Sequence, residues 1–335
     1  MSTTVERRVR TVRESLASTL GEAMAADESM VLLGETVRAG GAQGVARGLY
    51  ERFGPSRVIE TPVSENGIFG AALGLALSGF RPVVEIYSAD FLLAVANEIV
   101  NDIAKWRIQH GQPGAQLPVL IRGCMGATAG LGPEHSQSME PFFFHSPGLQ
   151  ICVPSTLENA PALLDAALES RQPTLFLEHR KVYELQGSGT PEPRPAAEPG
   201  TAEVVRVGTD LTMVAWGWMR TEAEAACATL AEHGVTVELV DPRWIRPFDY
   251  ATVVNSVAKT GRLLVLEEAF ITGGIGAEIL ARVTEAFPGR ALVATRVAMP
   301  DVIHPYHAEM ERQILPTAAD AVHAALRLVR NQDES

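Results

Sequence analysis

Residues 60–86 read ETPVSENGIFGAALGLALSGFRPVVEI, and this stretch decides the type of fold. The segment Glu60 to Gly67 ends a strand, Ile68 to Leu77 predicts a helix that is apolar on all faces and therefore buried, and Pro82 to Ile86 predicts another strand. Strands that alternate with helices in this way lie parallel in one sheet. The stretch therefore predicts an α/β protein.

The same alternation continues on both sides of this stretch. Further strands are predicted at Met30–Leu33, Pro118–Ile121, Leu149–Val153, Thr174–Leu177, Leu211–Trp216, Val235–Val240 and Leu263–Glu267. Helices are predicted at Val9–Met24, Thr156–Ser170 (opened by a Ser155–Glu158 capping box), Thr221–His233, Phe248–Lys259, Gly274–Phe287 and Thr317–Val329. We expect two α/β domains, each a largely parallel sheet with helices on both faces.

A change of composition separates the two expected domains. From Gln186 to Gly200 the sequence reads QGSGTPEPRPAAEPG, with four prolines, three glycines and no apolar face to bury. Such a stretch is typical of an exposed connector. We expect a first domain at residues 1–185, a linker at 186–200 and a second domain at 201–335, each domain large enough to bury its own core.

Composition and charge exclude several classes of protein. The net charge of −12 argues against nucleic acid or an anionic membrane as a partner. No apolar run approaches the ~20 residues that span a bilayer, and the polar N-terminus lacks an apolar signal core, so we expect a cytoplasmic protein. Cys124, Cys152 and Cys227 are widely separated, which favours neither a disulfide framework nor a metal site.

Glu65 is the first candidate site residue, because it stands where a strand has ended and a helix opens. One interpretation is structural: Ser64 caps the helix and Glu65 complements the helix dipole. The other is functional: Glu65 is half-buried and faces a ligand at the carboxyl end of a strand, where α/β sheets place their sites.

His135 is the second candidate. It lies in GCMGATAGLGPEHSQ, residues 123–137, where four glycines follow a predicted strand. By composition alone this is equally a mobile surface loop with an incidental histidine. Together with Glu65, however, it would supply a carboxylate and an imidazole on two strand-end loops, a combination suited to general acid and base chemistry.

Several ordered motifs resemble one family, the β subunit of the thiamin-diphosphate-dependent decarboxylating component of 2-oxoacid and acetoin dehydrogenase complexes, in the transketolase-like superfamily. The motifs are LLGE at 32–35, TPVSE at 61–65, LGPEHSQ at 131–137, HSPGL at 145–149, LEHR at 177–180, DLTMV at 210–214, DPRWIRPFD at 241–249 and TGGIGAE at 272–278. The resemblance implies a pyrimidine-binding domain followed by a transketolase C-terminal-type domain that serves dimerisation and docking.

The resemblance also implies roles for individual residues. Glu65 would hydrogen-bond the aminopyrimidine ring of thiamin diphosphate and favour its imino tautomer, Phe91 would stack on that ring, and Glu35 would be a second acidic residue of the pocket. His135 would lie beside the thiazolium ring, where an ordinary imidazole pKa of ~6.5 suits proton transfer. Glu65 and His135 are thus the expected catalytic residues.

Other parts of the site must come from elsewhere. The family binds the diphosphate and Mg2+ through a Gly-Asp-Gly motif of the partner α subunit, and this chain has no Gly-Asp-Gly. The resemblance therefore implies an α2β2 heterotetramer. In place of the Asp and Asn that often bind K+ in the family, the chain has Ser170 and Gln172, which argues against a structural cation there.

The resemblance implies an oxidoreductase subunit that acts on pyruvate, a branched-chain 2-oxoacid or acetoin and passes the acyl group to a lipoyl-bearing acyltransferase. The segment Met139–Phe144 differs from the small or aliphatic residues common in the family, which suggests an altered substrate pocket. One alternative is a transketolase-like carboligase with an aldehyde acceptor, although Asn66 follows Glu65 where that group often has His or Gln-His. Another is an inactive partner subunit, against which the presence of Glu65, Phe91 and His135 argues.

Overall fold

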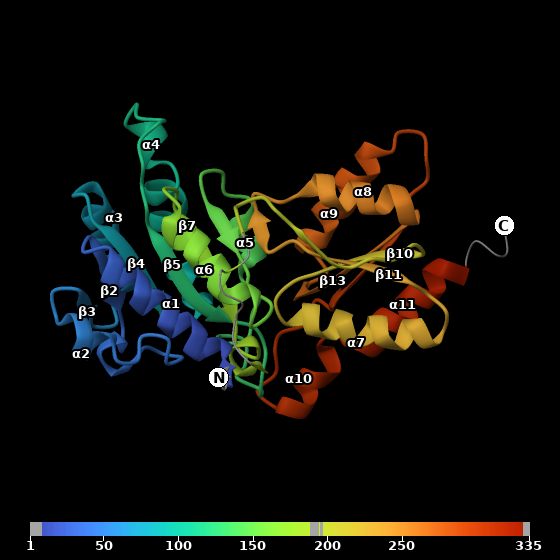
Figure 1. The fold of residues 1–335 in the computed structure, drawn as a ribbon, viewed down its shortest axis with the longest axis horizontal. Coiled ribbons are helices and arrows are strands. Elements are labelled where there is room, and N and C mark those ends of the chain that lie inside the picture. The colour runs from blue at the N-terminus through green and yellow to red at the C-terminus, as the bar shows by residue number, and fades with distance from the viewer. Residues whose placement is uncertain (1–8, 188–193, 195–196, 331–335) are drawn as a thin grey trace, which may run out of the picture. The chain divides into compact units, whose positions relative to one another are not determined.

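The computed structural model describes residues 9–187, 194 and 197–330. The chain divides into two compact units (Figure 1): the first contains Met1–Met125 and Ser146–Glu198, and the second contains Gly126–His145 and Pro199–Ser335. The segment Gly126–His145 thus packs with the second unit, although the residues on both sides of it belong to the first. The expected boundaries at 185 and 200 stay a prediction.

The first unit is built around a parallel sheet. Its elements are β1 (Arg10–Thr11), α1 (Val12–Ala26), β2 (Met30–Gly34), η1 (Val37–Ala39), α2 (Leu49–Phe53), β3 (Val58–Glu60), α3 (Glu65–Leu77), β4 (Arg81–Ile86), η2 (Ala89–Val95), η3 (Glu98–Ile103), α4 (Trp106–Gln109), β5 (Leu120–Met125), β6 (Gln150–Cys152), α6 (Asn159–Glu169), β7 (Thr174–His179), η4 (Val182–Glu184) and β8 (Gln186–Gly187). The strands β6-β7-β5-β4-β2-β3 neighbour one another in this order and pair in parallel. The stretch at residues 58–86 therefore forms the predicted strand, helix and strand, with β2 between the two strands.

Part of the expected linker is regular structure. β8, its first two residues, pairs antiparallel with β1 at the start of the chain. Residues 188–193 and 195–196 of the expected linker lie outside the described residues. The described remainder includes Arg194, whose guanidinium forms ion pairs with Glu22 and Asp165.

The helix α3 differs from its prediction. It begins at Glu65 and buries Ile68, Phe69, Ala72 and Ala76, while Leu77 is 46% exposed. The prediction of a helix buried on all faces is therefore wrong for this chain alone, because α3 packs on the sheet through one side only. Among the described residues, no helix combines the length and the apolar character that crossing a bilayer requires.

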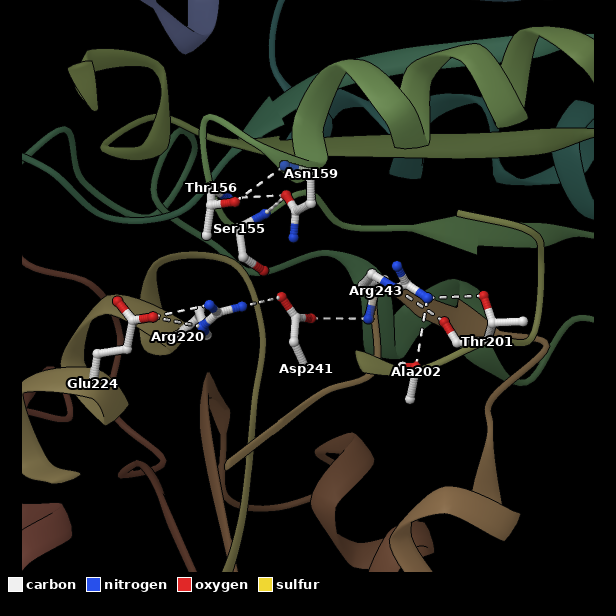
Figure 2. A network of polar contacts seen from close by, with 9 residues as sticks. All are labelled: Ser155, Thr156, Asn159, Thr201, Ala202, Arg220, Glu224, Asp241 and Arg243. Atoms are coloured by element: carbon white, nitrogen blue, oxygen red, sulfur yellow. Dashed lines mark hydrogen bonds and ion pairs between the residues drawn. The ribbon is translucent and has the colours of Figure 1, made fainter. Parts of the chain in front are cut away.

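The start of α6 also differs from its prediction (Figure 2). The expected capping box of Ser155 and Glu158 is absent, and the helix begins at Asn159. The Asn159 side chain instead accepts hydrogen bonds from the backbone N–H groups of Ser155 and Thr156, and the Thr156 hydroxyl accepts one from the Asn159 N–H. A capping box does open α1, where Thr11 caps the helix.

The second unit contains a mixed sheet between two helix layers. Its elements are α5 (Glu140–Phe144), β9 (Glu203–Arg206), β10 (Leu211–Ala215), α7 (Trp218–Glu232), β11 (Val237–Asp241), β12 (Trp244–Arg246), α8 (Tyr250–Thr260), β13 (Arg262–Phe270), α9 (Ile275–Ala286), β14 (Val293–Met299), α10 (Ala308–Ile314) and α11 (Ala318–Arg330). The strands run in the order β14-β13-β10-β11-β9, and only β9 pairs antiparallel. Helices α7 and α11 cover one face of this sheet, and α8 and α9 cover the other (Figure 1).

A polar network fixes the loop after β11 (Figure 2). Asp241 accepts hydrogen bonds from Arg220 Nη1 at 3.1 Å and from the Arg243 backbone N–H at 2.9 Å. The Arg243 guanidinium donates to the carbonyl and the hydroxyl of Thr201, and Arg220 also pairs with Glu224. The Asp-Pro-Arg part of the motif at 241–249 therefore has a structural role within this unit.

Candidate active site

The carboxyl ends of three adjacent strands carry three of the four candidate residues. Glu35 follows β2 directly, Glu65 lies five residues after β3, and Phe91 lies in η2 after β4. Because β3 and β4 flank β2 in the parallel sheet, all three residues lie at the same edge of the first unit. The side chains of all three are half-buried.

Glu65 is the first residue of α3, and the structure decides against one part of the structural interpretation. Ser64 precedes the helix, but its side chain makes no cap hydrogen bond. Asn66, which follows Glu65, donates its side-chain N–H to Glu98 Oε1 at 2.7 Å. Ser64 therefore does not act as the predicted cap, and the helix dipole alone favours a carboxylate at position 65.

Glu35 and Glu65 interact electrostatically. Partial burial raises the pKa of Glu35, and the negative charge of Glu65 raises it further. A carboxyl group with a raised pKa near a second carboxylate is characteristic of functional sites, although it also occurs elsewhere. The structure therefore brings together two of the residues that the sequence singled out.

A buried ion network lies in the strands that lead to this edge. Arg122 on β5 is 1% exposed, and its guanidinium pairs with Glu85 on β4 at 3.0 Å and with Glu178 on β7 at 2.7 Å. The Tyr183 hydroxyl donates to the second oxygen of Glu178. The sequence analysis assigned no role to these residues, and their only signal was charge within apolar strand runs.

His135 lies in the second unit, in the loop that follows β5. Its side chain is half-buried. This loop is held within its unit, since the Ala127 N–H donates to Glu268 and the Gly130 N–H donates to Glu311. The expectation that His135 and Glu65 share one site stays a prediction.

Two further glutamates are buried in the second unit without full hydrogen bonding. Burial raises the pKa of Glu140 and of Glu267 to about 7. Glu140 accepts a hydrogen bond from Trp216 Nε1 at 3.0 Å, and Glu267 accepts one from the Gly276 N–H at 3.0 Å. The second oxygen of each carboxyl group has no hydrogen-bond partner among the described residues.

Glu267 explains the glycines of the TGGIGAE motif. A Cβ at Gly276 would lie 2.5 Å from Glu267 Oε1, and one at Gly274 would lie 2.7 Å from the same atom. The two glycines therefore leave room for a buried carboxyl group at the start of α9. The motif needs no nucleotide ligand to account for it.

The loop that carries Ser170 and Gln172 is held by several hydrogen bonds. The Ser170 hydroxyl donates to Gln150 Oε1 at 2.7 Å and accepts from the Gln172 N–H at 3.2 Å. The Thr174 hydroxyl lies 3.0 Å from the Gln172 carbonyl oxygen. Among the described residues, no group of three or more His, Cys, Asp or Glu side chains is arranged to hold a metal ion, and Cys124, Cys152 and Cys227 are buried and form no disulfide.

Comparison with known protein families gives two matches that together span most of the chain. The transketolase pyrimidine binding domain matches residues 9–186, and the transketolase C-terminal domain matches residues 200–321. The solved structure of a split gene transketolase, described as an inactive β4 tetramer, aligns with a TM-score of 0.79 over 96% of this chain and 99% of that one. Its sequence identity of 24% makes this a likeness of fold alone.

Relatives with higher identity agree with the resemblance seen in the motifs. The chain is 40% identical over 326 residues to pyruvate dehydrogenase E1 component subunit beta-2 of Oryza sativa subsp. japonica, which covers 95% of this chain and 85% of that protein. It is 35% identical over 331 residues to acetoin:2,6-dichlorophenolindophenol oxidoreductase subunit beta of Cupriavidus necator, which covers 95% of this chain and 97% of that protein. The chain therefore belongs to the transketolase-like, thiamin-diphosphate-dependent family, in the group formed by the β subunits of pyruvate and acetoin dehydrogenases.

Proposed function

We propose that this chain supplies the aminopyrimidine half of a thiamin-diphosphate site that decarboxylates a 2-oxoacid or cleaves acetoin. The observation that carries the proposal is the pair of interacting carboxyl groups, Glu35 and Glu65, at the carboxyl edge of one parallel sheet, with Phe91 after the neighbouring strand. A half-buried carboxyl group and a half-buried aromatic ring suit the polar edge and the flat face of an aminopyrimidine ring.

The residues have distinct roles in this proposal. When bound, thiamin diphosphate supplies a thiazolium ring that accepts the electrons released by decarboxylation. Glu65 holds a proton at the pyrimidine ring nitrogen and so sets the tautomer of that ring. Phe91 orients the ring by stacking, Glu35 lines the same pocket, and His135 moves a proton near the oxygen of the substrate.

A partner subunit completes the site in this proposal. The chain has no Gly-Asp-Gly motif, and the carboxyl edge of the first unit presents groups that fit a pyrimidine rather than a diphosphate. We therefore assign the diphosphate and Mg2+ ligands to an α subunit in an α2β2 heterotetramer. No K+ site is proposed at Ser170 and Gln172, because the Ser170 hydroxyl is used in hydrogen bonds to Gln150 Oε1 and from the Gln172 N–H.

The proposed acceptor of the acyl group is a lipoyl-bearing acyltransferase. Identity of 35–40% to subunits of pyruvate and acetoin dehydrogenases favours it over the aldehyde acceptor of a carboligase, since the likeness to transketolase is one of fold. A cytoplasmic location is also part of the proposal and is tested by fractionation, because several relatives are named as mitochondrial proteins.

The variant Glu65→Gln tests the proposal in the assembly reconstituted with the α subunit. Glutamine keeps the size of the side chain but cannot hold or release a proton, so turnover should fall by ~10² or more. Exchange of the thiazolium proton of the bound cofactor with deuterated water should slow by a similar factor. Circular dichroism should show an unchanged fold.

The matched control is Glu51→Gln, which changes an exposed glutamate in the first turn of α2. It should leave both rates unchanged. If Glu65→Gln also exchanges the thiazolium proton at the rate of the unchanged protein, Glu65 only complements the dipole of α3 and the proposed catalytic role is lost.

A further inference from the structure

The loop that carries His135 is anchored at its start. We call residues 126–137 the histidine loop. Ala127 is fully buried in a small apolar cluster with Met299 and Leu315, and its N–H donates to Glu268 Oε1 at 2.8 Å. A glycine-rich loop of this composition could have been mobile, but its first residues are part of the core of the second unit.

A single buried carboxylate joins the middle of the loop to its end. Glu311 on α10 is 1% exposed. Its Oε2 accepts a hydrogen bond from the Gly130 N–H at 2.9 Å, and its Oε1 accepts one from the Ser136 hydroxyl at 3.2 Å. Ser136 is the residue next to His135, so Glu311 holds the loop on both sides of the histidine.

Close backbone contact reinforces this clamp. Gly130 has a φ of 73°, and a Cβ there would lie 2.6 Å from both the Tyr306 carbonyl oxygen and the Ala308 backbone nitrogen. Gly132 in turn has a φ of 79° and lies against the ring of Tyr306. The glycines therefore allow the loop to press against the segment that leads into α10, where Glu311 can reach it.

We propose that Glu311 is a positioning residue for His135. Its two hydrogen bonds hold Gly130 and Ser136. They thereby fix the position of His135, which lies between these two residues in the sequence. This inference rests on the proposed catalytic role of His135, and it adds a residue from α10 that acts through the histidine. Fixing a general acid or base in one place contributes to rate, because small displacements of a catalytic group are costly.

The test uses the variant Glu311→Gln in the full chain. Glutamine offers a single acceptor oxygen, so one of the two hydrogen bonds is lost. Amide hydrogen exchange of the loop should speed up by about tenfold or more, the factor that corresponds to one hydrogen bond to a charged group. The matched control is Glu309→Gln, an exposed glutamate of the same helix that pairs with Arg312, and it should leave loop exchange unchanged.

A second variant covers the case in which Glu311→Gln folds poorly. Ser136→Ala removes only the hydroxyl that donates to Glu311 Oε1 and leaves the Gly130 hydrogen bond in place. It should speed exchange at the end of the loop and spare Ala127, which is held by Glu268.

Kinetics of the reconstituted assembly separate positioning from general stability. Glu311→Gln should lower kcat by about tenfold and leave KM for the 2-oxoacid within about twofold, because the imidazole is misplaced while substrate binding is spared. In a His135→Ala background, Glu311→Gln should cause no further loss of kcat. A merely structural role would lower activity in both backgrounds in proportion to the unfolded fraction.

Each contrary result would overturn a different part of the proposal. Unchanged loop exchange in both variants would show that Glu311 does not hold the loop, and the proposed function would be unaffected. Faster exchange with unchanged kcat, while His135→Ala is slow, would show that the clamp does not position the histidine. If His135→Ala itself turns over normally, the catalytic role of His135 fails and the positioning role fails with it.

Discussion

In the first unit a buried arginine lies between two glutamates, whereas in the second unit two glutamates are buried and one oxygen of each has no hydrogen-bond partner in the described part of the chain. Arg122 balances Glu85 and Glu178 across three adjacent strands. Glu140 and Glu267 receive one neutral N–H donor each, from Trp216 and Gly276. These two sets of buried carboxyl groups therefore lie under different electrostatic conditions, one beside a cation and the other beside neutral donors.

The difference shows in the protonation of the groups. Burial acts to lower the pKa of Arg122, but the attraction of Glu178 and Glu85 outweighs it, so that the guanidinium pKa is raised. Burial is the largest cause that raises the pKa of Glu140 and Glu267 to about 7, where nearby acids add to the effect. In the first unit burial also raises the pKa of Glu85 and Glu178, but the charge of Arg122 acts against this rise. Glu140 and Glu267 in the second unit pair with no cation among the residues that the structure describes, and their pKa is about 7.

Each set of buried charges belongs to the unit that carries some of the candidate residues. Glu85 and Arg122 face each other in the register of β4 and β5, so the network ties together the centre of the sheet whose edge carries Glu35 and Glu65. Strands held in a fixed register place residues at their ends in fixed positions. In the second unit, Glu140 follows the histidine loop in sequence, and its charge changes within the pH range in which enzymes work.

Removal of Arg122 should have the largest effect on stability. In Arg122→Met two carboxylates remain buried without their cation, and the free energy of unfolding should fall by about 3–5 kcal/mol. Urea denaturation measures the loss. The comparison variant, Arg282→Met, breaks an exposed pair with Glu278 and should leave the unfolding curve unchanged.

A triple variant tests whether charge balance is the cause. Replacing Glu85 and Glu178 by Gln in the Arg122→Met background removes the uncompensated charges, so much of the lost stability should return. No recovery would mean that Arg122 acts through packing, and the contrast between the two units would then rest on shape rather than on charge.

The pH dependence of stability should come from the second unit. Because the pKa of Glu140 and Glu267 is about 7 when folded and near 4.5 when unfolded, the folded state binds more protons between these values. Their contribution is fully present below pH 4.5 and is lost as the pH rises through 7. From pH 5 to pH 8, each group should lower the free energy of unfolding by roughly 2–4 kcal/mol.

Glutamine variants separate the two groups. Glu140→Gln should be more stable than the unchanged protein at pH 8 and should show a flatter dependence of stability on pH, since an amide does not ionise. Glu267→Gln should behave in the same way. A slope that stays the same in both variants would show that other groups cause the pH dependence.

The sequence predicted the strands well where the apolar run is continuous. Met30–Leu33 and Thr174–Leu177 both appear as strands, within β2 and β7. The strand predicted at Pro118–Ile121 is instead Leu120–Met125. It continues beyond the apolar run through Arg122, whose burial depends on Glu85 and Glu178. A charged residue in a strand is recognisable as buried only when its partners on other strands are known.

Prediction of the candidate site from the sequence has the same limit. Glu65 and Glu35 were singled out by motif, but their interaction depends on the strand order that places β2 beside β3. Glu311 gave no local signal, since its partner Ser136 is 175 positions away along the chain. Sequence motifs thus identified the side chains at the edge of the sheet, and the contacts that hold them required the fold.

Tyr183→Phe should have the smallest effect on stability among these variants. It measures what a single hydrogen bond contributes to the network of Arg122, Glu85 and Glu178. The variant keeps the buried ring, since Tyr183 is 2% exposed, and removes only the hydroxyl that donates to Glu178 Oε2 at 3.0 Å. Arg122 still pairs with Glu178, so the free energy of unfolding should fall by only about 1–2 kcal/mol. Urea denaturation at neutral pH measures this loss beside that of Arg122→Met. A loss as large as that of Arg122→Met would make Tyr183 the main partner of Glu178, and the first unit would then resemble the second, with a buried carboxyl group that depends on a neutral donor.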